Sequence, residues 1–295
     1  MLVALVLAAL VVGPSSQSCV CKTIQWADCK GNPCSCYLLV GDNTKQILNC
    51  TTLIPKCLLM KAEMYRAKKG LDTRTIGGKP LETSFIYNPE CENDGMFKAK
   101  QCNDSSECWC VNSAGFRRTD KGDKDLKCEK LVKTNKVHLD LIHKSVDGEV
   151  DAKKLEVHFK DEFHKRYNNS IKDIDRMLSI EYHPKDRWIA VVVKELEGVE
   201  NTDLTSLAYY IENDVKLRPL FETSEMFKLT VGTIKLELKE IKVFSMDEKS
   251  PTSSGKLMSN VNISILVVAL LMIVVITAWI CISQYRQRQE RRQHS

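Results

Sequence analysis

Hydrophobic and polar residues alternate with two different periods in the second half of the chain. Residues 136–141 alternate strictly, as the residues of a half-buried strand do. Two later stretches repeat their apolar residues about every 3.6 positions, which is the period of an amphipathic helix. The first helical stripe consists of Ala152, Leu155, Phe159, Phe163 and Tyr167, and the second of Leu204, Leu207, Ala208, Ile211 and Val215.

Further strands are expected between and after the two helices. Residues 177–182 and 188–193 have the pattern of strands, and the turn-forming residues 183–186 separate them. A last run, 227–244, alternates twice around Gly232. The order strand, helix, strand, strand, helix, strand predicts an α+β domain of the split βαβ kind over residues 129–248.

Continuous apolar runs lie near both ends of the chain. Residues 2–12 are all apolar and precede small polar residues, which is typical of a signal peptide over 1–18, the alternative being a buried core helix. Residues 263–282 carry no charge. At about 1.5 Å per residue, a helix of this length crosses a hydrocarbon layer of about 30 Å. We therefore expect one transmembrane helix over 263–283.

The charges that follow this helix predict its orientation. Residues 284–292 contain four Arg and one Glu, so the tail 284–295 should stay in the cytosol. The expected product is a single-pass type I protein of the plasma membrane with its N-terminus outside the cell. The polar stretch 249–262, which contains Pro251 and Gly255, is expected to be a flexible linker open to proteolytic shedding.

Cysteines are concentrated in the first part of the chain. Twelve of the 13 precede residue 129. In an oxidising compartment such density indicates disulfides, and zinc is disfavoured because no C-x2-C pair occurs. The last one, Cys281, is either an apolar filler or a palmitoylation site. The others form two clusters of six, Cys19, Cys21, Cys29, Cys34, Cys36 and Cys50, then Cys57, Cys91, Cys102, Cys108, Cys110 and Cys128.

The residues alone leave the pairing open, since six cysteines allow many connectivities. Neighbours two positions apart, such as Cys34 and Cys36, are expected to bond elsewhere, because their side chains point the same way in an extended chain.

Net charge and composition exclude several classes of protein. The formal charge is only +5, from 43 basic and 38 acidic residues, and it is scattered, so a nucleic-acid binder is not expected. With 13 Gly and 8 Pro in 295 residues, the chain is neither collagenous nor broadly disordered.

The second cysteine cluster contains a specific motif. Gln101-Cys102 is followed by Cys108-Trp109-Cys110-Val111 and by Gly115. This arrangement resembles the thyroglobulin type-1 module, here over 57–128. Trp109 lies between two bridge-forming cysteines, where its ring is expected to pack on sulfur and form the core of the module.

A wider set of motifs resembles the family of the epithelial cell adhesion molecule and the trophoblast antigen. The motifs are Cys19-Val20-Cys21, Lys61-Ala62-Glu63-Met64, Phe97 to Cys102, Arg117-Arg118-Thr119-Asp120 and Ala208-Tyr209-Tyr210. The resemblance implies a disulfide-rich N-terminal domain over 19–56. It also implies the pairs Cys19–Cys34, Cys21–Cys50, Cys29–Cys36, Cys57–Cys91, Cys102–Cys108 and Cys110–Cys128.

The resemblance further implies homotypic adhesion and signalling at lateral cell contacts. In the family, the long loop of the thyroglobulin module packs on the membrane-proximal domain of a second copy and forms a symmetric cis dimer. Here the segment from Lys61 to Pro80 holds six basic and two acidic residues. The residues expected to form the dimer loop are Arg66, Lys68, Lys69 and Arg74.

The resemblance also suggests other partners. Claudins and tetraspanins are implied, although Ala269 and Ala278 are too far apart to form the small-residue face that is thought to meet claudins. The competing function is a membrane-anchored inhibitor of papain-like cysteine proteases such as cathepsins, which thyroglobulin type-1 modules can block with their Gln-Cys and Cys-Trp-Cys-Val turns.

An enzyme is not expected. His158 and His164 are about 240° apart on a helix and so do not share a metal-binding face. The sequence contains none of the common catalytic or phosphate-binding motifs, and no cofactor is expected. Glycosylation sequons occur at Asn49, Asn103, Asn168 and Asn262, of which Asn103 and Asn168 are the favoured sites.

Overall fold

The computed structural model describes residues 19–71, 75–76, 79–80, 87–103, 105–196, 202–216, 219–222, 225–249, 272–273, 276–280 and 282. The predicted signal peptide and tail lie outside these residues, as do the predicted linker after Lys249 and most of the predicted membrane helix. Among the residues described, no helix has both the length and the apolar character needed to span a bilayer. Residues up to 117 and from 121 to 250 form one compact unit, and all contacts below are within it.

The N-terminal domain is a small antiparallel sheet held by disulfides. Its strands are β1 (Asp28–Lys30), β2 (Ser35–Gly41) and β3 (Thr44–Ile47), in the order β1-β2-β3. So short a segment buries little apolar surface and needs covalent bridges. The bridges are Cys19–Cys34, Cys21–Cys50 and Cys29–Cys36, which are the pairs that the family resemblance implies.

The second cysteine cluster surrounds a helix and two short hairpins. Helix α1 (Lys56–Lys68) leads to β4 (Thr75–Ile76) and β5 (Lys79–Pro80), which pair with each other. Strands β6 (Lys100–Cys102) and β7 (Cys108–Cys110) form the second hairpin. The bridges are Cys57–Cys91, Cys102–Cys108 and Cys110–Cys128, again the implied pairs.

The rest of the unit has the predicted α+β order. Strand β8 (Thr134–His143), helix α2 (Ala152–Tyr167), a 3-10 turn (Ile174–Met177), β9 (Leu178–His183), β10 (Trp188–Lys194) and helix α3 (Leu204–Lys216) follow one another. The predicted last run contains the hairpin β11 (Leu229–Val231) and β12 (Ile234–Leu236), then β13 (Leu238–Asp247). The sheet is antiparallel in the order β13-β8-β10-β9, which confirms the α+β prediction.

Both helices of this domain cover one face of the sheet. Asp151 caps α2 by accepting hydrogen bonds from the backbone N–H groups of Lys153 and Lys154, at 2.9 and 3.1 Å. The stripe predicted for α2 is buried from Leu155 to Tyr167, while Ala152 at its start is exposed. On the sheet, Leu139 and its alternate neighbours face these helices and are fully buried.

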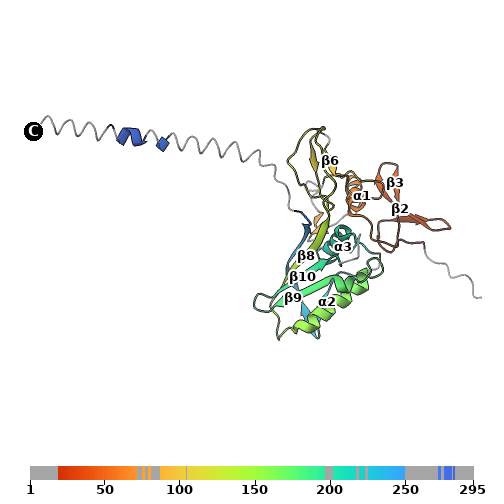
Figure 1. Cartoon of the computed structure of the whole chain (residues 1–295). Helices are drawn as coiled ribbons and strands as arrows, with labels where there is room; N and C mark the ends of the chain where they lie inside the picture. The colour runs from red at the N-terminus through yellow and green to blue at the C-terminus, as the bar shows by residue number, and fades with distance from the viewer. Residues whose placement is uncertain are drawn as a thin grey trace, which may run out of the picture. The chain divides into compact units, whose positions relative to one another are not determined.

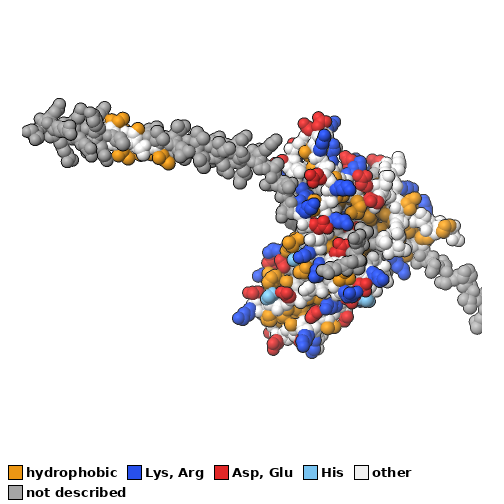
Figure 2. All heavy atoms as spheres, in the orientation of Figure 1, with side chains coloured by type: hydrophobic (Ala, Val, Ile, Leu, Met, Phe, Trp, Pro, Cys, Tyr) orange, Lys and Arg blue, Asp and Glu red, His pale blue; other side chains and the backbone are white. Residues whose placement is uncertain are grey.

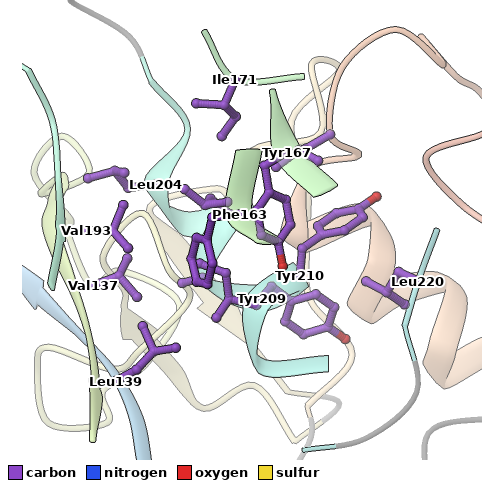
Figure 3. Close-up of a cluster of buried hydrophobic side chains, with 14 of the residues drawn as sticks. Val137, Leu139, Phe163, Tyr167, Ile171, Val193, Leu204, Tyr209, Tyr210 and Leu220 are labelled. Carbon is purple, nitrogen blue, oxygen red and sulfur yellow. The ribbon is translucent and has the colours of Figure 1, made fainter. Parts of the chain in front are cut away.

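Helix α3 is buried on nearly all sides, although its sequence predicts a single apolar stripe. The stripe is buried as expected, but so are its polar and aromatic neighbours Thr205, Ser206, Tyr209, Tyr210, Asn213 and Asp214. In Figure 3, Val137, Leu139 and Val193 of the sheet lie on one side of the cluster, and the rings of Tyr209 and Tyr210 lie on the other. Figure 1 shows why, since α3 lies between the sheet and α1.

Hydrogen bonds from α3 and the chain after it join the three parts of the unit. The Tyr210 hydroxyl donates to the carbonyl of Thr23 (2.8 Å) and accepts from the N–H of Ile54 (3.3 Å). The Tyr209 hydroxyl donates to the buried Glu63 carboxylate of α1 at 3.0 Å. Two motifs that carry the family resemblance, 61–64 and 208–210, therefore meet at one domain junction.

A buried acid lies at the end of α3. Asp214 accepts a hydrogen bond from the Tyr167 hydroxyl at 2.5 Å and lies 3.3 Å from Nη1 of Arg166. Its side chain is 1% exposed. Burial raises the pKa of Asp214 to about 6, although the Tyr167 hydrogen bond and the charge of Arg166 lower it in part.

We expect Tyr210→Phe to lower the free energy of unfolding by about 1–3 kcal/mol, because it leaves the buried Thr23 carbonyl and Ile54 N–H without their partner. The measurement is denaturant unfolding of the full chain in detergent. The control is Tyr37→Phe on β2, whose half-buried ring lies below Lys45 and which should behave as wild type. Equal stability of the two variants would contradict this account of the junction.

Asp214 should give stability a distinct pH dependence. Its pKa is raised in the folded state from 3.8 to about 6. Its contribution to the free energy of unfolding is therefore complete below pH 4 and is lost as the pH rises through 6. At roughly 1.4 kcal/mol per pKa unit, the loss is about 2–4 kcal/mol.

The test compares the unfolding free energy of wild type and Asp214→Asn between pH 4 and 7. The difference between them should shift in favour of the variant as the pH rises through this window. Asp161→Asn, which removes an exposed carboxylate of α2, controls for net charge. A constant difference between wild type and Asp214→Asn would show that this carboxyl does not titrate in the window.

Candidate recognition surface

The sheet of the α+β domain has one face that none of the described helices covers. Along β8 the side chains alternate, so Val137, Leu139 and Leu141 are buried while His138 and Asp140 between them remain partly exposed. Antiparallel sheets commonly leave one face to solvent in this way. We call this surface the open sheet face; it comprises Lys136, His138, Asp140 and Ile142 of β8, Trp188, Ala190 and Val192 of β10, Glu181 and His183 of β9, and Glu240, Lys242, Phe244 and Met246 of β13.

Aromatic side chains are prominent on the open sheet face. Phe244 and Met246 of β13 are 43% and 45% exposed, which is high for large apolar side chains. The ring of His138 stacks on Phe244 with centroids 5.1 Å apart, and that of His183 stacks on Trp188 at 4.6 Å. These cross-strand pairs fix flat rings on a rigid sheet, and such surfaces suit the binding of another protein.

One end of the open sheet face contains an acidic hollow. Its volume is ≈ 290 Å³, and it is lined by Asp140, Ile142, Asp186, Trp188, Glu240 and Lys242. The indole Nε1 of Trp188 donates to Asp140 at 3.2 Å, which holds the ring in place. Lys242 pairs with Glu240 at 2.6 Å and lowers the pKa of that carboxyl, so it stays ionised at neutral pH. Three carboxylates and one ammonium give this hollow a net negative charge.

The residues predicted for the dimer loop fall in three different places. Arg66 and Lys68 belong to the last turn of α1, and the Arg66 guanidinium lies 5.3 Å from the ring centroid of Trp26 in the N-terminal domain. Lys69 pairs with Asp42 at 2.7 Å. Arg74 lies outside the described residues, immediately before β4. Arg74 is the first basic residue of the segment that follows Lys69.

Trp109 is buried in the thyroglobulin-like module, but its identified ring partner is an aromatic side chain. Its ring meets Tyr87 edge to face, with the ring centroids 5.4 Å apart. The Tyr87 hydroxyl donates to the carbonyl of Gly115 at 3.0 Å. Gly115 has φ +78°, and a Cβ there would lie 2.6 Å from the ring of Phe97, so the glycine of the motif is required.

Gln101, the other motif residue, acts inside the module. Its side-chain oxygen accepts from the N–H of Glu90 at 2.7 Å, and its amide donates to the carbonyls of Glu90 and Lys98 at 2.9 and 2.7 Å. The residue is 1% exposed. Its side chain therefore ties two turns together and is not available to a partner.

Both favoured sequons have exposed asparagines. Asn103 lies in the turn between β6 and β7, and its side-chain amide donates to Glu107 at 3.1 Å. Asn168 is the C-cap of α2. Asn49 is also exposed, and it accepts from the Thr51 hydroxyl at 2.7 Å. Asn262 lies outside the described residues.

Two groups of three cysteines come close enough to resemble metal ligands. They are Cys21, Cys36 and Cys50, and Cys29, Cys34 and Cys36. All are disulfide-bonded, and a disulfide sulfur is not the thiolate that binds a metal. These groups therefore reflect dense bridging.

Sequence reasoning missed the open sheet face, although a signal was present. The alternation in 136–141 shows that one face is buried, and Trp188 and Phe244 fall on the opposite face once the register is known. The acidic hollow combines residues of three strands and a turn, so no single segment predicts it. In Figure 2 basic and acidic side chains are mixed over the face in view.

Comparison with known proteins supports the family resemblance. The thyroglobulin type-1 repeat family matches residues 57–128, and the family described as EPCAM/Trop-2, C-terminal, matches 134–247. Together they cover α1 to β13, that is, both the module and the α+β domain.

Individual relatives match most of the chain. The chain is 36% identical over 247 residues to the human (Homo sapiens) epithelial cell adhesion molecule, covering 81% of this chain and 76% of the relative. It is 32% identical over 279 residues to human tumor-associated calcium signal transducer 2, covering 90% and 83%. The mouse (Mus musculus) form of the latter is 31% identical over 250 residues, covering 82% and 76%.

The relatives' names describe adhesion and signal transduction, not catalysis, which confirms the prediction that this is not an enzyme. The two family matches and the similarity over four fifths or more of the sequence place the protein: this chain belongs to the EPCAM/Trop-2 family.

Proposed function

We propose that the chain is a cell-surface adhesion and signalling protein that acts by forming a cis dimer with a second copy. The open sheet face is the observation that carries this proposal, because it presents exposed apolar rings and an acidic hollow on a rigid sheet. The names of the relatives, an adhesion molecule and a signal transducer, agree with such a role.

The complementary element is the hairpin that follows α1. Strands β4 and β5 pair through Thr75 with Pro80 and Ile76 with Lys79. The sequence around them carries Arg74 and Lys79, with Asp72 before the hairpin and Glu82 after it. The two cations of this segment, Arg74 and Lys79, fit the carboxylates of the acidic hollow, and the indole of Trp188 can stack on a guanidinium.

A symmetric dimer uses this contact twice. In a two-fold arrangement the hairpin of each copy meets the open sheet face of the other, so both contacts form together. Confinement to one membrane raises the effective concentration of the second copy, and a modest affinity for each contact is then sufficient.

Membrane anchoring completes the proposal. The helix at 263–283 would hold the described unit outside the cell, with the tail 284–295 in the cytosol. The linker 249–262 is the proposed site of shedding, which would release a soluble fragment into the medium. Claudin, tetraspanin and cathepsin contacts rest on the resemblance alone, so we assign self-association as the primary activity.

The protease-inhibitor alternative is less well supported by the geometry. Gln101 and Trp109, the side chains that mark the two turns, are buried and bonded within the module. Only backbone and smaller side chains of these turns could enter a protease cleft.

Charge reversal tests the dimer. We expect Asp186→Arg in the acidic hollow, or Arg74→Glu before the hairpin, to lower severalfold the yield of crosslinked dimer of the full chain on cells. The double variant should recover much of it, because both symmetric contacts are re-formed with opposite signs. Asp147→Arg, an exposed loop position outside the open sheet face, is the control and should leave the yield unchanged.

Two outcomes would count against this function. One is a crosslinked dimer that is indifferent to both single reversals. The other is a monomeric wild-type chain that inhibits a cysteine cathepsin at nanomolar concentration, which would favour the inhibitor.

The glycosylation sites form a separate prediction. Asn103→Gln and Asn168→Gln should each remove one endoglycosidase-sensitive step in gel mobility, because both side chains are exposed on turns or helix ends. Asn49→Gln should change nothing, since closure of Cys21–Cys50 next to it competes with transfer of the glycan. A mobility shift for Asn49→Gln with none for Asn168→Gln would reverse the assignment.

A further inference from the structure

A second concave surface lies on the opposite side of the α+β domain, where α2 meets the N-terminal domain. It is a pocket of ≈ 800 Å³, within the size range of small-molecule sites. It is lined by Lys22, Thr23, Cys50, Thr51, His158, Glu162, Lys165, Arg166, Asn169, Ser170, Phe221, Glu225, Met226, Lys228 and Thr230. None of these residues belongs to the open sheet face.

One wall of this pocket is a single face of α2. His158, Glu162 and Lys165 recur at intervals of four and three residues, so they line up along the helix, and Asn169 lies in the turn after it. The buried stripe of α2 faces the sheet. This polar stripe therefore faces away from the core.

The opposite wall belongs to the N-terminal domain and is fixed in place. Lys22 and Thr51 lie next to the Cys21–Cys50 bridge, which joins the two strands of chain that carry them. The carbonyl of Lys22 accepts from the N–H of Glu222 at 3.2 Å, next to Phe221 of the pocket. The disulfide fixes the segments of Lys22 and Thr51, and the hydrogen bond joins them to the segment of Phe221. The pocket is therefore preformed.

Positive charge exceeds negative charge in this pocket. Four cationic side chains, Lys22, Lys165, Arg166 and Lys228, stand against Glu162 and Glu225. Lys228 pairs with Glu225 at 2.9 Å. The other carboxylate, Glu162, lies between Lys165 and Arg166 at 3.9 and 3.5 Å.

Arg166 provides the cation that is held most rigidly. Its side chain is 8% exposed, and neither its Nε nor its Nη1 makes a hydrogen bond within the described part of the chain. Glu162 and Asp214 contact it only as ion pairs, at 3.5 and 3.3 Å. A guanidinium keeps its charge at any physiological pH, and Glu162 and Asp214 offset part of that charge at the base of the pocket.

The neutral side chains of the pocket suit the hydroxyl groups and the apolar ring face of a sugar. Thr51, Ser170, Asn169 and Thr230 offer hydroxyl and amide groups for hydrogen bonds with sugar hydroxyls. The half-buried Phe221 and the exposed Met226 offer apolar surface for the C–H face of a pyranose. Fixed cations, short polar side chains and an apolar patch together favour an anionic saccharide over a purely apolar ligand.

We infer that this pocket between α2 and the N-terminal domain binds a sulfated saccharide, with Lys22, Lys165, Arg166 and Lys228 facing its sulfate groups. The inference is independent of the proposed dimer, because it uses a different surface. It would let the protein bind the glycosaminoglycan chains found between cells while its open sheet face remains available.

The test measures binding of a fluorescent, fully sulfated heparin tetrasaccharide to the full chain in detergent micelles. The chain is first treated with an endoglycosidase, because a sugar on the favoured sequon at Asn168 would stand next to Asn169 and Ser170 of the pocket. We expect saturable binding that weakens as salt is raised. The N-desulfated, O-desulfated tetrasaccharide should bind at least tenfold more weakly.

A matched pair of variants locates the site. Lys22→Ala with Lys165→Ala should raise the Kd at least tenfold, whereas Lys153→Ala with Lys172→Ala, which removes two exposed charges outside the pocket, should change it less than twofold. An equal loss in both double variants would mean that the saccharide responds to net charge alone and would overturn the inference. So would the absence of binding by wild type, or equal binding of the desulfated tetrasaccharide.

Discussion

The fold depends on a helix that no single domain could bury. Helix α3 contacts the sheet through its apolar stripe, while Tyr209 and Tyr210 reach α1 and the N-terminal domain. Each buried hydroxyl has a defined partner, and buried polar groups are tolerable only under that condition. The three parts of the unit are therefore held in one arrangement by directional hydrogen bonds as well as by apolar contact.

The parts of the unit before and after Cys128 are stabilised in different ways. Before it, six disulfides compensate for domains too small to form a large core. After it, a cysteine-free domain relies on a sheet covered by two helices, with Leu139, Phe159 and Ile211 fully buried. The small domains add their own apolar side chains to the same core, which includes Ile24, Leu38 and Leu59.

The same architecture produces two different recognition surfaces. Because both helices lie on one face of the sheet, the other face is left with rings and charges fixed by the strand register. Because the N-terminal domain packs beside α2, a hollow with a charged base forms between them. The first surface suits a protein partner by its flatness and aromatic content, and the second suits a smaller anionic ligand by its concavity.

Much of this organisation could be predicted from the residues alone. The alternation in 136–141, the two helical stripes and the turn at 183–186 were enough for the α+β order, because local periodicity reflects which side chains face a core. The motif from Gln101 to Gly115 was enough for the thyroglobulin-like module, because its glycine and glutamine are required by close packing.

Tertiary structure alone decided the rest. The burial of Ser206, Tyr210 and Asp214 on α3 depends on domains far away in the chain, so the helix pattern could not reveal it. The placing of Lys69 against Asp42, and of Lys22 opposite Lys165, likewise joins residues from separate domains. A sequence pattern shows which side chains of a segment are apolar and so are expected to be buried. It does not show which residues bury them, because those residues come from other domains that meet only in the folded chain.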